Sequence, residues 1–274
     1  MAPDFTVVTP SYNYGRFIGD CLESVASQEG VTLEHLVMDA GSDDNTAEVV
    51  SEFPHASFFQ EPDKGMSDGI NKGFRRASGK WVMWLNADDR LRPGALTRVK
   101  EFAEANPDSD VIFGCWNFVD GGGEFIKRMT LFPFDQRMLA MDACYIASTS
   151  CFYRRESTIS EGHLLNEGFR LCMDGEYFTR LAANGKVFSY LPAVLADFRL
   201  HDASISQQHL GKRDMESTVK HQRLLAEPRS IRRVYGLTPF KNDKCNGAFD
   251  FVVFIYFRLK KRLLKALHAG RTVD

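Results

Sequence analysis

The sequence predicts an α/β protein built on a doubly wound, mainly parallel sheet. Over the first 110 residues, short apolar runs typical of buried strands alternate with segments whose apolar residues recur at helical spacing. Three of the apolar runs lead into the polar loops SYNYG, AGSDDN and NADD. Ligands of open α/β sheets bind at the carboxyl ends of the strands, so we expect a site where these loops meet.

The composition is that of an ordinary globular protein. Of the 274 residues, 44% are hydrophobic and 26% are charged, which suits one large α/β domain or two smaller ones. The formal net charge of −2 gives no electrostatic case for nucleic acid as a partner. The six cysteines are scattered, without a C-x-x-C pair or a histidine at zinc-finger spacing, and we expect reduced thiols.

Neither a signal peptide nor a transmembrane helix is predicted. The amino terminus, MAPDFTVVTP, lacks a basic start and an apolar core of signal length, so we interpret it as the approach to the first strand. The longest apolar run, residues 251–257, falls far short of the ~20 residues that span a bilayer. We therefore expect a cytoplasmic protein.

The elements of the first half alternate regularly. We predict strands at 5–9, 33–38, 57–60 and 81–85, and helices at 17–26, 46–52, 69–77 and 93–105. Asp39 ends the second strand, and Asp44 or Asn45 could cap the helix that follows. Gly79 stops the third helix, and Pro93 suits the first turn of the fourth.

From residue 110 the pattern is less regular. The runs 110–119 and 125–130 flank the glycine-rich turn 120–124, which predicts an antiparallel hairpin added to the sheet. The other expected elements are helices at 134–142 and 174–183, strands at 150–154, 187–191 and 194–200, and a polar surface helix at 206–226. No linker divides the first 200 or so residues into independent domains.

Residues 61–91 carry the densest group of polar residues. Lys64, Gly65 and Asp68 occupy a turn before the third predicted helix, and the NADD sequence at 86–89 follows the fourth strand. Two acids, a lysine and a helix start can form a site for a metal ion and a diphosphate. An Asp-Asp pair after a strand can also be only a turn, because aspartate hydrogen-bonds its own backbone.

Five sequence blocks follow one another within about residues 4–206. They are TPSYNYGRFIGDCLESV, VMDAGSDDNTAEVV, EPDKGMSDGINKGFRRASGKWVMWLNADD, MDGEYFTRL and FRLH. Together they resemble the family-2 inverting glycosyltransferases, which have the nucleotide-sugar-binding GT-A fold. The resemblance implies a GT-A domain at 1–206, with a nucleotide-sugar half (1–110) and an acceptor half (111–206), followed by a helical tail at 207–274.

The resemblance implies a nucleotide-diphosphate sugar as donor, with UDP as the expected nucleotide. By matched position, Thr9, Pro10 and Tyr12 would line the base and ribose, and Asp39 would accept a hydrogen bond from a uracil ring nitrogen. The other matched donor-binding positions are Gly41, Ser42, Lys64, Gly65, Asp68, Asn86, Ala87, Asp88 and Asp89. For Tyr12 the alternative is an aromatic residue packed on the surface.

The family's metal-binding D-x-D signature falls on Asn86-Ala87-Asp88, with asparagine in place of the first acid. Because an amide is the weaker ligand, we expect Mn²⁺ or Mg²⁺ mainly on Asp88, with Asp89 nearby as a ligand or sugar contact. His201 matches a histidine that lies near the metal and diphosphate in relatives, although a lone histidine is more often a surface or core residue. Such a metal stabilises the charge on a departing diphosphate.

Inversion requires a general base opposite the leaving group. Asp174, in MDGEYFTRL, matches the family's base and would take the proton of the acceptor hydroxyl. The alternative role of Asp174 is that of a helix N-cap. Glu176 is the second candidate for the base.

The carboxyl-terminal tail is basic and amphipathic. Residues 258–271 carry six Lys or Arg and no acid, interleaved with leucines at helical spacing. This pattern suits a helix on an anionic membrane surface, where bacterial relatives extend lipid-linked saccharides. Packing of the tail on the catalytic domain, or an oligomer contact, is the alternative.

The sequence thus predicts a metal-dependent inverting glycosyltransferase of the hexosyl or N-acetylhexosaminyl class. Its acceptor would be a saccharide hydroxyl, with a polyprenyl-linked saccharide of cell-surface polysaccharide biosynthesis as one candidate, at the inner face of the cytoplasmic membrane. A nucleotidyltransferase is one alternative, but TPSYNYGRF is a poor version of that class's Gly-rich loop. A non-catalytic scaffold that binds sugar nucleotides is the other, kept open by Asn86.

Overall fold

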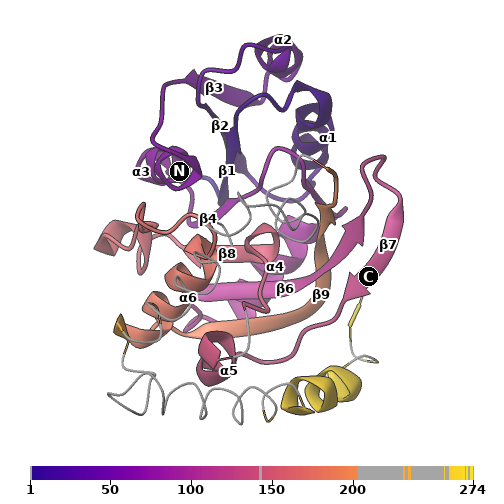
Figure 1. The fold of residues 1–274 in the computed structure, drawn as a ribbon, viewed down its shortest axis with the longest axis vertical. Coiled ribbons are helices and arrows are strands. Elements are labelled where there is room, and N and C mark those ends of the chain that lie inside the picture. The colour runs from indigo at the N-terminus through magenta and orange to yellow at the C-terminus, as the bar shows by residue number, and fades with distance from the viewer. Residues whose placement is uncertain are drawn as a thin grey trace, which may run out of the picture.

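The computed structural model describes residues 2–141, 144–202, 231, 234–235, 256, 259–268, 270 and 272–273. The described strands form one nine-stranded sheet of order β3-β2-β1-β4-β8-β6-β9-β5, with β7 paired to β6 (Figure 1). The strands are β1 (Phe5–Ser11), β2 (Leu33–Asp39), β3 (Ala56–Gln60), β4 (Trp81–Trp84), β5 (Arg90–Leu91), β6 (Val111–Val119), β7 (Phe125–Met129), β8 (Cys151–Arg154) and β9 (Phe188–Arg199).

The amino-terminal half of the sheet is parallel, as predicted. β1 lies between β2 and β4, and β3 pairs with β2. In this register Ser11 lies opposite Asp39, and Asp39 lies opposite Gln60. The amide of Leu85 donates to the carbonyl of Val8 (2.9 Å), which continues β4 by one residue. The loops that follow β1, β2 and β4 therefore leave the sheet at one edge.

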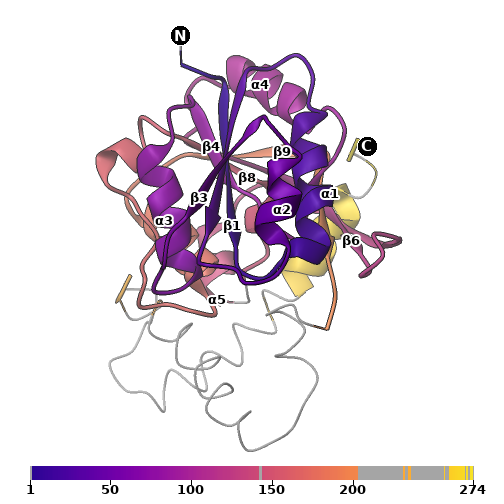
Figure 2. The ribbon, with the colours of Figure 1, turned by 90° about the horizontal axis from the view of Figure 1, so that it is seen from above.

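Helices cover both faces of the sheet. They are α1 (Gly15–Ala26), α2 (Thr46–Ser51), α3 (Met66–Arg76), α4 (Ala95–Ala105), α5 (Gln136–Met141) and α6 (Met173–Ala183), with short 3-10 turns η1 (Ser148–Ser150) and η2 (Ile159–Glu161). Side chains alternate along β4, so Val82 and Trp84 pack with α3 and α6, whereas Met83 packs with α1 and α4. Figure 2 shows α3 and α1 on opposite sides of the strands. The doubly wound architecture is confirmed.

An aromatic cluster joins the two halves of the sheet. Trp84 of β4 stacks on Tyr153 of β8 with ring centroids 5.5 Å apart, and Phe74 of α3 and Tyr177 of α6 pack around them. All four side chains are almost completely buried. Burial of each large apolar side chain contributes about 1.5–3 kcal/mol, so this cluster holds α3 and α6 firmly beside the end of β4.

Several element boundaries differ from the predicted ones. β9 is one strand of 12 residues, although we expected two that stop on either side of Pro192. The strand continues because the pairing of β6 with β9 shifts register at Cys115, and a proline is tolerated at such a bulge. The helix expected from Pro93 begins at Ala95, after Gly94 in the left-handed region (φ 69°). The two-residue strand β5 was not predicted.

The described part of the tail packs on the domain. Residues 259–268 are helical, and Leu264 packs against the main core cluster. Val273 forms a β-bridge with Ala193 of β9. The helix expected at 206–226 lies outside the described residues. Within the described part of the chain, no helix has the length and apolar character needed to span a bilayer, and its five cysteines are free thiols.

Candidate functional site

The loop after β1 provides one wall of the site. Tyr12 is 58% exposed at this edge, and Asn13 adopts a left-handed conformation (φ 58°). Thr9 is completely buried, and its hydroxyl lies 2.9 Å from Nε2 of His35. The side chain of Thr9 therefore supports the loop from beneath, and its expected place beside the base and ribose stays a prediction. Pro10 is also buried, so Tyr12 is the exposed member of the predicted group.

Asp39 organises the loop after β2. Its Oδ1 accepts from the amides of Gly41 (3.0 Å) and Ser42 (2.7 Å), and its Oδ2 accepts from the Ser42 hydroxyl (2.5 Å). Gly41 has φ 99°, which strongly favours glycine at this position. Asp39, Gly41 and Ser42 thus form one unit at the carboxyl edge. Asp44 turns back to the first loop, where its Oδ2 accepts from the amide of Gly15 (2.9 Å).

The loop before α3 brings a basic side chain to the same edge. Lys64 is exposed, and its amide donates to Oδ2 of Asp68 (3.1 Å). Gly65 adopts φ 128° and precedes the first residue of α3, where a side chain would be strained. The helix begins at Met66, three residues before the predicted start. The predicted group Lys64, Gly65 and Asp68 is therefore brought together by the helix start.

The acid loop, residues 86–89, continues from β4. Asp89 is 1% exposed, and its carboxylate accepts from the Thr149 hydroxyl (2.6 Å), the Asn86 amide group (3.0 Å) and the backbone amide of Arg199 (2.9 Å). Burial first, and then the charge of Asp88, raises the pKa of Asp89 well above its usual value, while these donors act in the opposite direction. With three protein donors, Asp89 serves as an anchor of the loop, and its expected role as a metal ligand or sugar contact stays a prediction.

Asp88 and Asn86 keep polar atoms that could meet a ligand. Oδ2 of Asp88 lies 2.9 Å from Nε2 of His201, so the two predicted metal ligands meet although they are 113 residues apart. Oδ1 of Asn86 and the hydroxyl of Ser11, both buried, have no hydrogen-bond partner among the described residues. Carboxylate and imidazole are both suitable ligands for Mn²⁺. The described residues contain no group of three or more possible side-chain ligands, so a divalent ion at Asp88 and His201 would need its other ligands from a bound diphosphate and water.

His201 is held in place by aromatic side chains of α1 and the loop before it. Its ring lies over Phe17 with centroids 4.4 Å apart, and it meets Tyr14 edge-on at 6.1 Å. Beside it opens a cavity of about 620 Å³. The cavity is lined by Tyr12, Asn13, Tyr14, Arg16, Phe17, Gly121, Leu200, His201 and Asp202. This volume is in the range of small-molecule binding sites.

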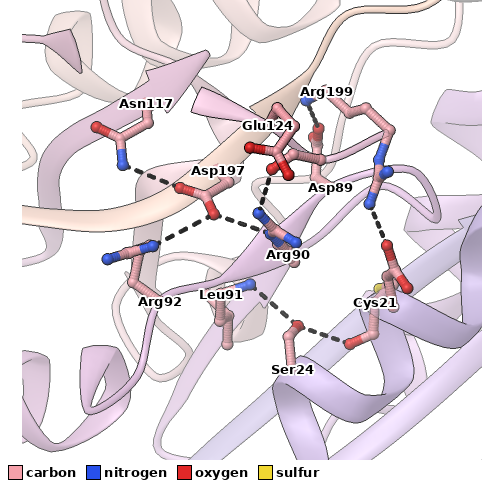
Figure 3. A network of polar contacts seen from close by, with 12 residues as sticks. Cys21, Ser24, Asp89, Arg90, Leu91, Arg92, Asn117, Glu124, Asp197 and Arg199 are labelled. Atoms are coloured by element: carbon pink, nitrogen blue, oxygen red, sulfur yellow. Dashed lines mark hydrogen bonds and ion pairs between the residues drawn. The ribbon is translucent and has the colours of Figure 1, made fainter. Parts of the chain in front are cut away.

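Two arginine networks, one around the buried Arg199 and one around the half-buried Arg90, fix the acid loop to the rest of the site (Figure 3). The Arg199 guanidinium, which is 3% exposed, contacts Oδ2 of Asp20 (2.5 Å) and the carbonyl oxygens of Asp88 (2.8 Å) and Gly121 (3.1 Å). Arg90 donates to Asp197 (2.9 Å) and to the carbonyl of Gly123 (2.7 Å). The acid loop, α1, the β6–β7 turn and the end of β9 therefore form one rigid unit. Sequence reasoning missed both arginines.

Asp174 lies in the first turn of α6, where we expected the general base. Its carboxylate accepts from backbone amides of its own turn, including that of Gly175 (2.7 Å). Burial raises the pKa of Asp174 above its ordinary value, which makes the carboxylate a better proton acceptor. The Ser67 hydroxyl contacts Sδ of Met173 (3.1 Å), so the start of α6 lies beside the start of α3.

Glu176, the second candidate base, forms hydrogen bonds with other side chains of the protein. It is 1% exposed, and its carboxylate is paired with the Arg180 guanidinium through contacts of 2.8 and 3.2 Å. The Tyr235 hydroxyl donates to its Oε1 at 2.6 Å. These donors occupy three of the roughly four acceptor positions of the carboxylate, which leaves Glu176 less suited than Asp174 to receive a substrate proton.

Comparison with known proteins identifies the family to which this chain is similar. A family model described as "Glycosyl transferase family 2" matches residues 6–160. The "PGL/p-HBAD biosynthesis glycosyltransferase" of Mycobacterium bovis is 29% identical over 209 residues, which cover 72% of this chain and 77% of the relative. The matched region of the family model includes the loops after β1, β2 and β4.

Two solved structures resemble the fold. S. aureus TarS in complex with UDP-GlcNAc has a TM-score of 0.61 at 18% identity, covering 93% of this chain and 81% of the other. The mannosyltransferase PcManGT from Pyrobaculum calidifontis, in complex with GDP-Man and Mn²⁺, has a TM-score of 0.57 at 16% identity, covering 98% and 86%. These likenesses confirm the predicted GT-A fold.

Proposed function

The chain belongs to glycosyl transferase family 2, and on that basis we propose that this glycosyltransferase moves a sugar from a nucleotide-diphosphate donor, UDP being favoured, to a hydroxyl of a saccharide. One observation carries the proposal: the loops after β1, β2 and β4 meet at one edge, with the contact between Asp88 and His201 beside a cavity of about 620 Å³. The bound nucleotide sugars named for TarS and PcManGT support the same donor class.

We propose that the nucleotide lies across the loops that follow β1, β2 and β3. Tyr12 is exposed and can pack its ring on a base, and Asp39 retains acceptor capacity on Oδ2. Lys64 is exposed beside the start of α3 and can meet the phosphates. Asn86, whose Oδ1 has no partner among the described residues, can accept a hydrogen bond from a ribose or sugar hydroxyl.

Asp88 and His201 are the proposed ligands of Mn²⁺ or Mg²⁺, and both would have to separate slightly from their present contact to share an ion. When bound, the ion would stabilise the negative charge that grows on the departing diphosphate. Asp89 contributes indirectly, because its contacts with Thr149 and the Arg199 amide fix the loop that carries Asp88.

The proposed reaction is a single displacement with inversion. The acceptor oxygen forms its bond to the anomeric carbon while the bond from that carbon to the diphosphate oxygen breaks. Asp174 receives the proton of the acceptor hydroxyl, and its raised pKa suits that role. The class of transferred sugar, hexosyl or N-acetylhexosaminyl, is part of the proposal, and the TarS complex supports the second of these.

We further propose that the acceptor is a lipid-linked saccharide of cell-surface polysaccharide biosynthesis and that the enzyme works at the inner face of the cytoplasmic membrane. The support is the tail, whose residues 258–271 carry six basic side chains and no acid.

Calorimetric titration with UDP, GDP, CDP and dTDP, with and without Mn²⁺, tests the donor and metal together. We expect one nucleotide to bind in the presence of Mn²⁺ and Asp88→Ala to lose that binding. Absence of binding by all four nucleotides to the folded wild type would contradict the proposal.

A further inference from the structure

The imidazole of His201 is held at one end only by a hydrogen bond within the described part of the chain. Its Nε2 lies 2.9 Å from Oδ2 of Asp88, and its Nδ1 has no hydrogen-bond partner among the described residues. A histidine that binds a metal usually donates its other ring nitrogen to a carboxylate or carbonyl, which fixes the direction of the ring. The His201 side chain is nevertheless 7% exposed, so packing has to supply its orientation.

The aromatic ring of Phe17 supplies most of this packing. The centroids of the Phe17 and His201 rings are 4.4 Å apart, and their planes are tilted by 38°. The other aromatic neighbour, Tyr14, meets the imidazole edge-on from 6.1 Å. Aromatic pairs in proteins have centroids about 4.5–7 Å apart, so the contact with Phe17 is a close one. The ring of Phe17 is therefore the main support of the imidazole.

The same ring also supports Arg199. The guanidinium carbon of Arg199 lies 5.2 Å from the centroid of Phe17, within the ~6 Å range of a cation–π contact. Arg199 in turn donates to the carbonyl of Asp88 (2.8 Å), and its backbone amide donates to Asp89 (2.9 Å). One aromatic ring therefore contacts both the proposed metal ligand His201 and the arginine that holds the loop carrying Asp88.

Phe17 lies between the protein interior and the cavity. It is 8% exposed in the first turn of α1, where its amide donates to the carbonyl of Tyr14 (2.8 Å). The guanidinium carbon of Arg16 lies 5.0 Å from the centroid of the ring. Phe17 and His201 both line the cavity of about 620 Å³. The ring is thus fixed by the helix start and lies where a ligand would meet His201.

We propose that Phe17 is a positioning residue of the metal site, whose ring directs the imidazole of His201 toward an ion beside Asp88 and supports Arg199 behind the acid loop. In the proposed function Asp88 and His201 separate slightly to share an ion. Packing against a ring permits this movement, because an apolar contact is less directional than a hydrogen bond. The inference rests on the proposed function, since it assigns a role toward the ion which that function requires.

The test compares Phe17→Tyr, which keeps the ring, with Phe17→Leu, which keeps an apolar side chain but has no π face. Electron paramagnetic resonance of free Mn²⁺ gives the Kd of the ion at saturating UDP. We expect Phe17→Leu to raise this Kd about tenfold or more, the usual effect of losing a group that orients a ligand. Phe17→Tyr should bind the ion as the wild type does, because the cavity beside the ring has room for a hydroxyl.

The matched control is Val25→Ala, which truncates a completely buried side chain in the last turn of α1. It should lower the melting temperature and leave the Kd of Mn²⁺ unchanged, as a purely structural role of Phe17 would. Should Phe17→Leu not fold, Phe17→Met replaces it, because the flexible methionine fills the space of the ring.

Three results would overturn the assignment of Phe17. They are an unchanged Kd of Mn²⁺ in the folded Leu or Met variant, an equal rise in Val25→Ala, and a rise in Phe17→Tyr as large as that in Phe17→Leu.

The wild-type titration separates this inference from the proposed function. If the wild type binds UDP with Mn²⁺ and the folded Phe17→Leu variant binds the ion equally well, this inference alone fails. A folded wild type without Mn²⁺-dependent binding of UDP would contradict the proposed metal site, and the role of Phe17 with it.

Discussion

The acid loop and the first turn of α6 each present two acids, and each region uses them differently. In the acid loop Asp89 is buried among three donors, whereas Asp88 contacts His201 at the edge of the sheet. In α6 Glu176 is buried against Arg180 and Tyr235, whereas Asp174 accepts only local hydrogen bonds among those described for it. We call Asp89 and Glu176 the anchoring acids, and Asp88 and Asp174 the open acids.

The comparison shows that, in each pair of neighbouring carboxylates, one has a structural role and the other keeps acceptor capacity for chemistry. An anchoring acid satisfies donors that would be costly to leave unpaired in a buried place. Each anchoring acid has at least one partner far away in sequence: Thr149 is 60 residues from Asp89, and Tyr235 is 59 residues from Glu176. An open acid keeps acceptor capacity for a ligand. Substitutions at the four positions should therefore fall into two classes.

Asp174→Asn should have the largest effect on turnover. Asparagine cannot take the acceptor proton, so we expect kcat to fall roughly 10²- to 10⁴-fold, the usual contribution of a general base. The Kd for UDP with Mn²⁺ should not change, because the donor loops are untouched. Steady-state kinetics and calorimetry on the same preparation measure both quantities. Loss of donor binding in this variant would place the base elsewhere.

Asp89→Asn should have the largest effect on stability. The amide cannot accept from Thr149, Asn86 and the Arg199 backbone as the carboxylate does, so the free energy of unfolding should fall by about 1–3 kcal/mol. Asp88→Asn is the matched control, which should retain the stability of the wild type and lose Mn²⁺-dependent UDP binding. Equal destabilisation by the two substitutions in denaturant titrations would contradict the division.

Asp20→Asn should have a smaller effect through Arg199. The Asp20 side chain is 54% exposed, so the loss of its ion pair with Arg199 should cost about 1 kcal/mol or less. Because Arg199 also contacts the Asp88 carbonyl, we expect a modest rise in the Mn²⁺ concentration needed for UDP binding. Glu23→Gln, another exposed acid of α1, is the control and should leave the Mn²⁺ requirement unchanged. If the two variants need the same Mn²⁺ concentration for UDP binding, Arg199 does not support the acid loop.

The pH dependence of stability should show the smallest effect. Burial raises the pKa of Asp174 in the folded state above its ordinary value of 3.8. At a pH between the unfolded and the folded pKa, the native protein therefore binds more protons than the unfolded chain, and it loses stability as the pH rises through this range. Asp174→Asn removes this loss. Its melting temperature should therefore exceed that of the wild type near neutral pH, and the difference should vanish below the ordinary pKa. A difference independent of pH would contradict the assignment.

Local patterns predicted the parallel half well. The alternation of strands and helices, the turn at 120–124 and the placement of three loops at one edge follow from periodicity and turn chemistry, which depend on neighbouring residues. The strand β5 escaped prediction because Arg90 and Leu91 become a strand only by pairing with β9. Pro192 suggested a break that a register shift in β6 removes.

Only part of the site was predicted, because local patterns do not specify long-range contacts. The meeting of Asp88 with His201 agrees with the family's order of blocks, but the buried positions of Thr9 and Asp89 depend on His35, Thr149 and the Arg199 backbone. Such partners are specified by tertiary packing and leave no local pattern. A buried arginine such as Arg199 is visible in sequence only as a charge in an otherwise apolar strand.

The turnover of Glu176→Gln, measured well below its melting temperature, tests the division of the acids most directly. Glutamine can still accept from Tyr235 and Arg180 through one oxygen, so the account predicts a lower melting temperature and a kcat within about threefold of the wild type. A kcat reduced as far as that of Asp174→Asn, with the melting temperature unchanged, would contradict it and would make Glu176 the base.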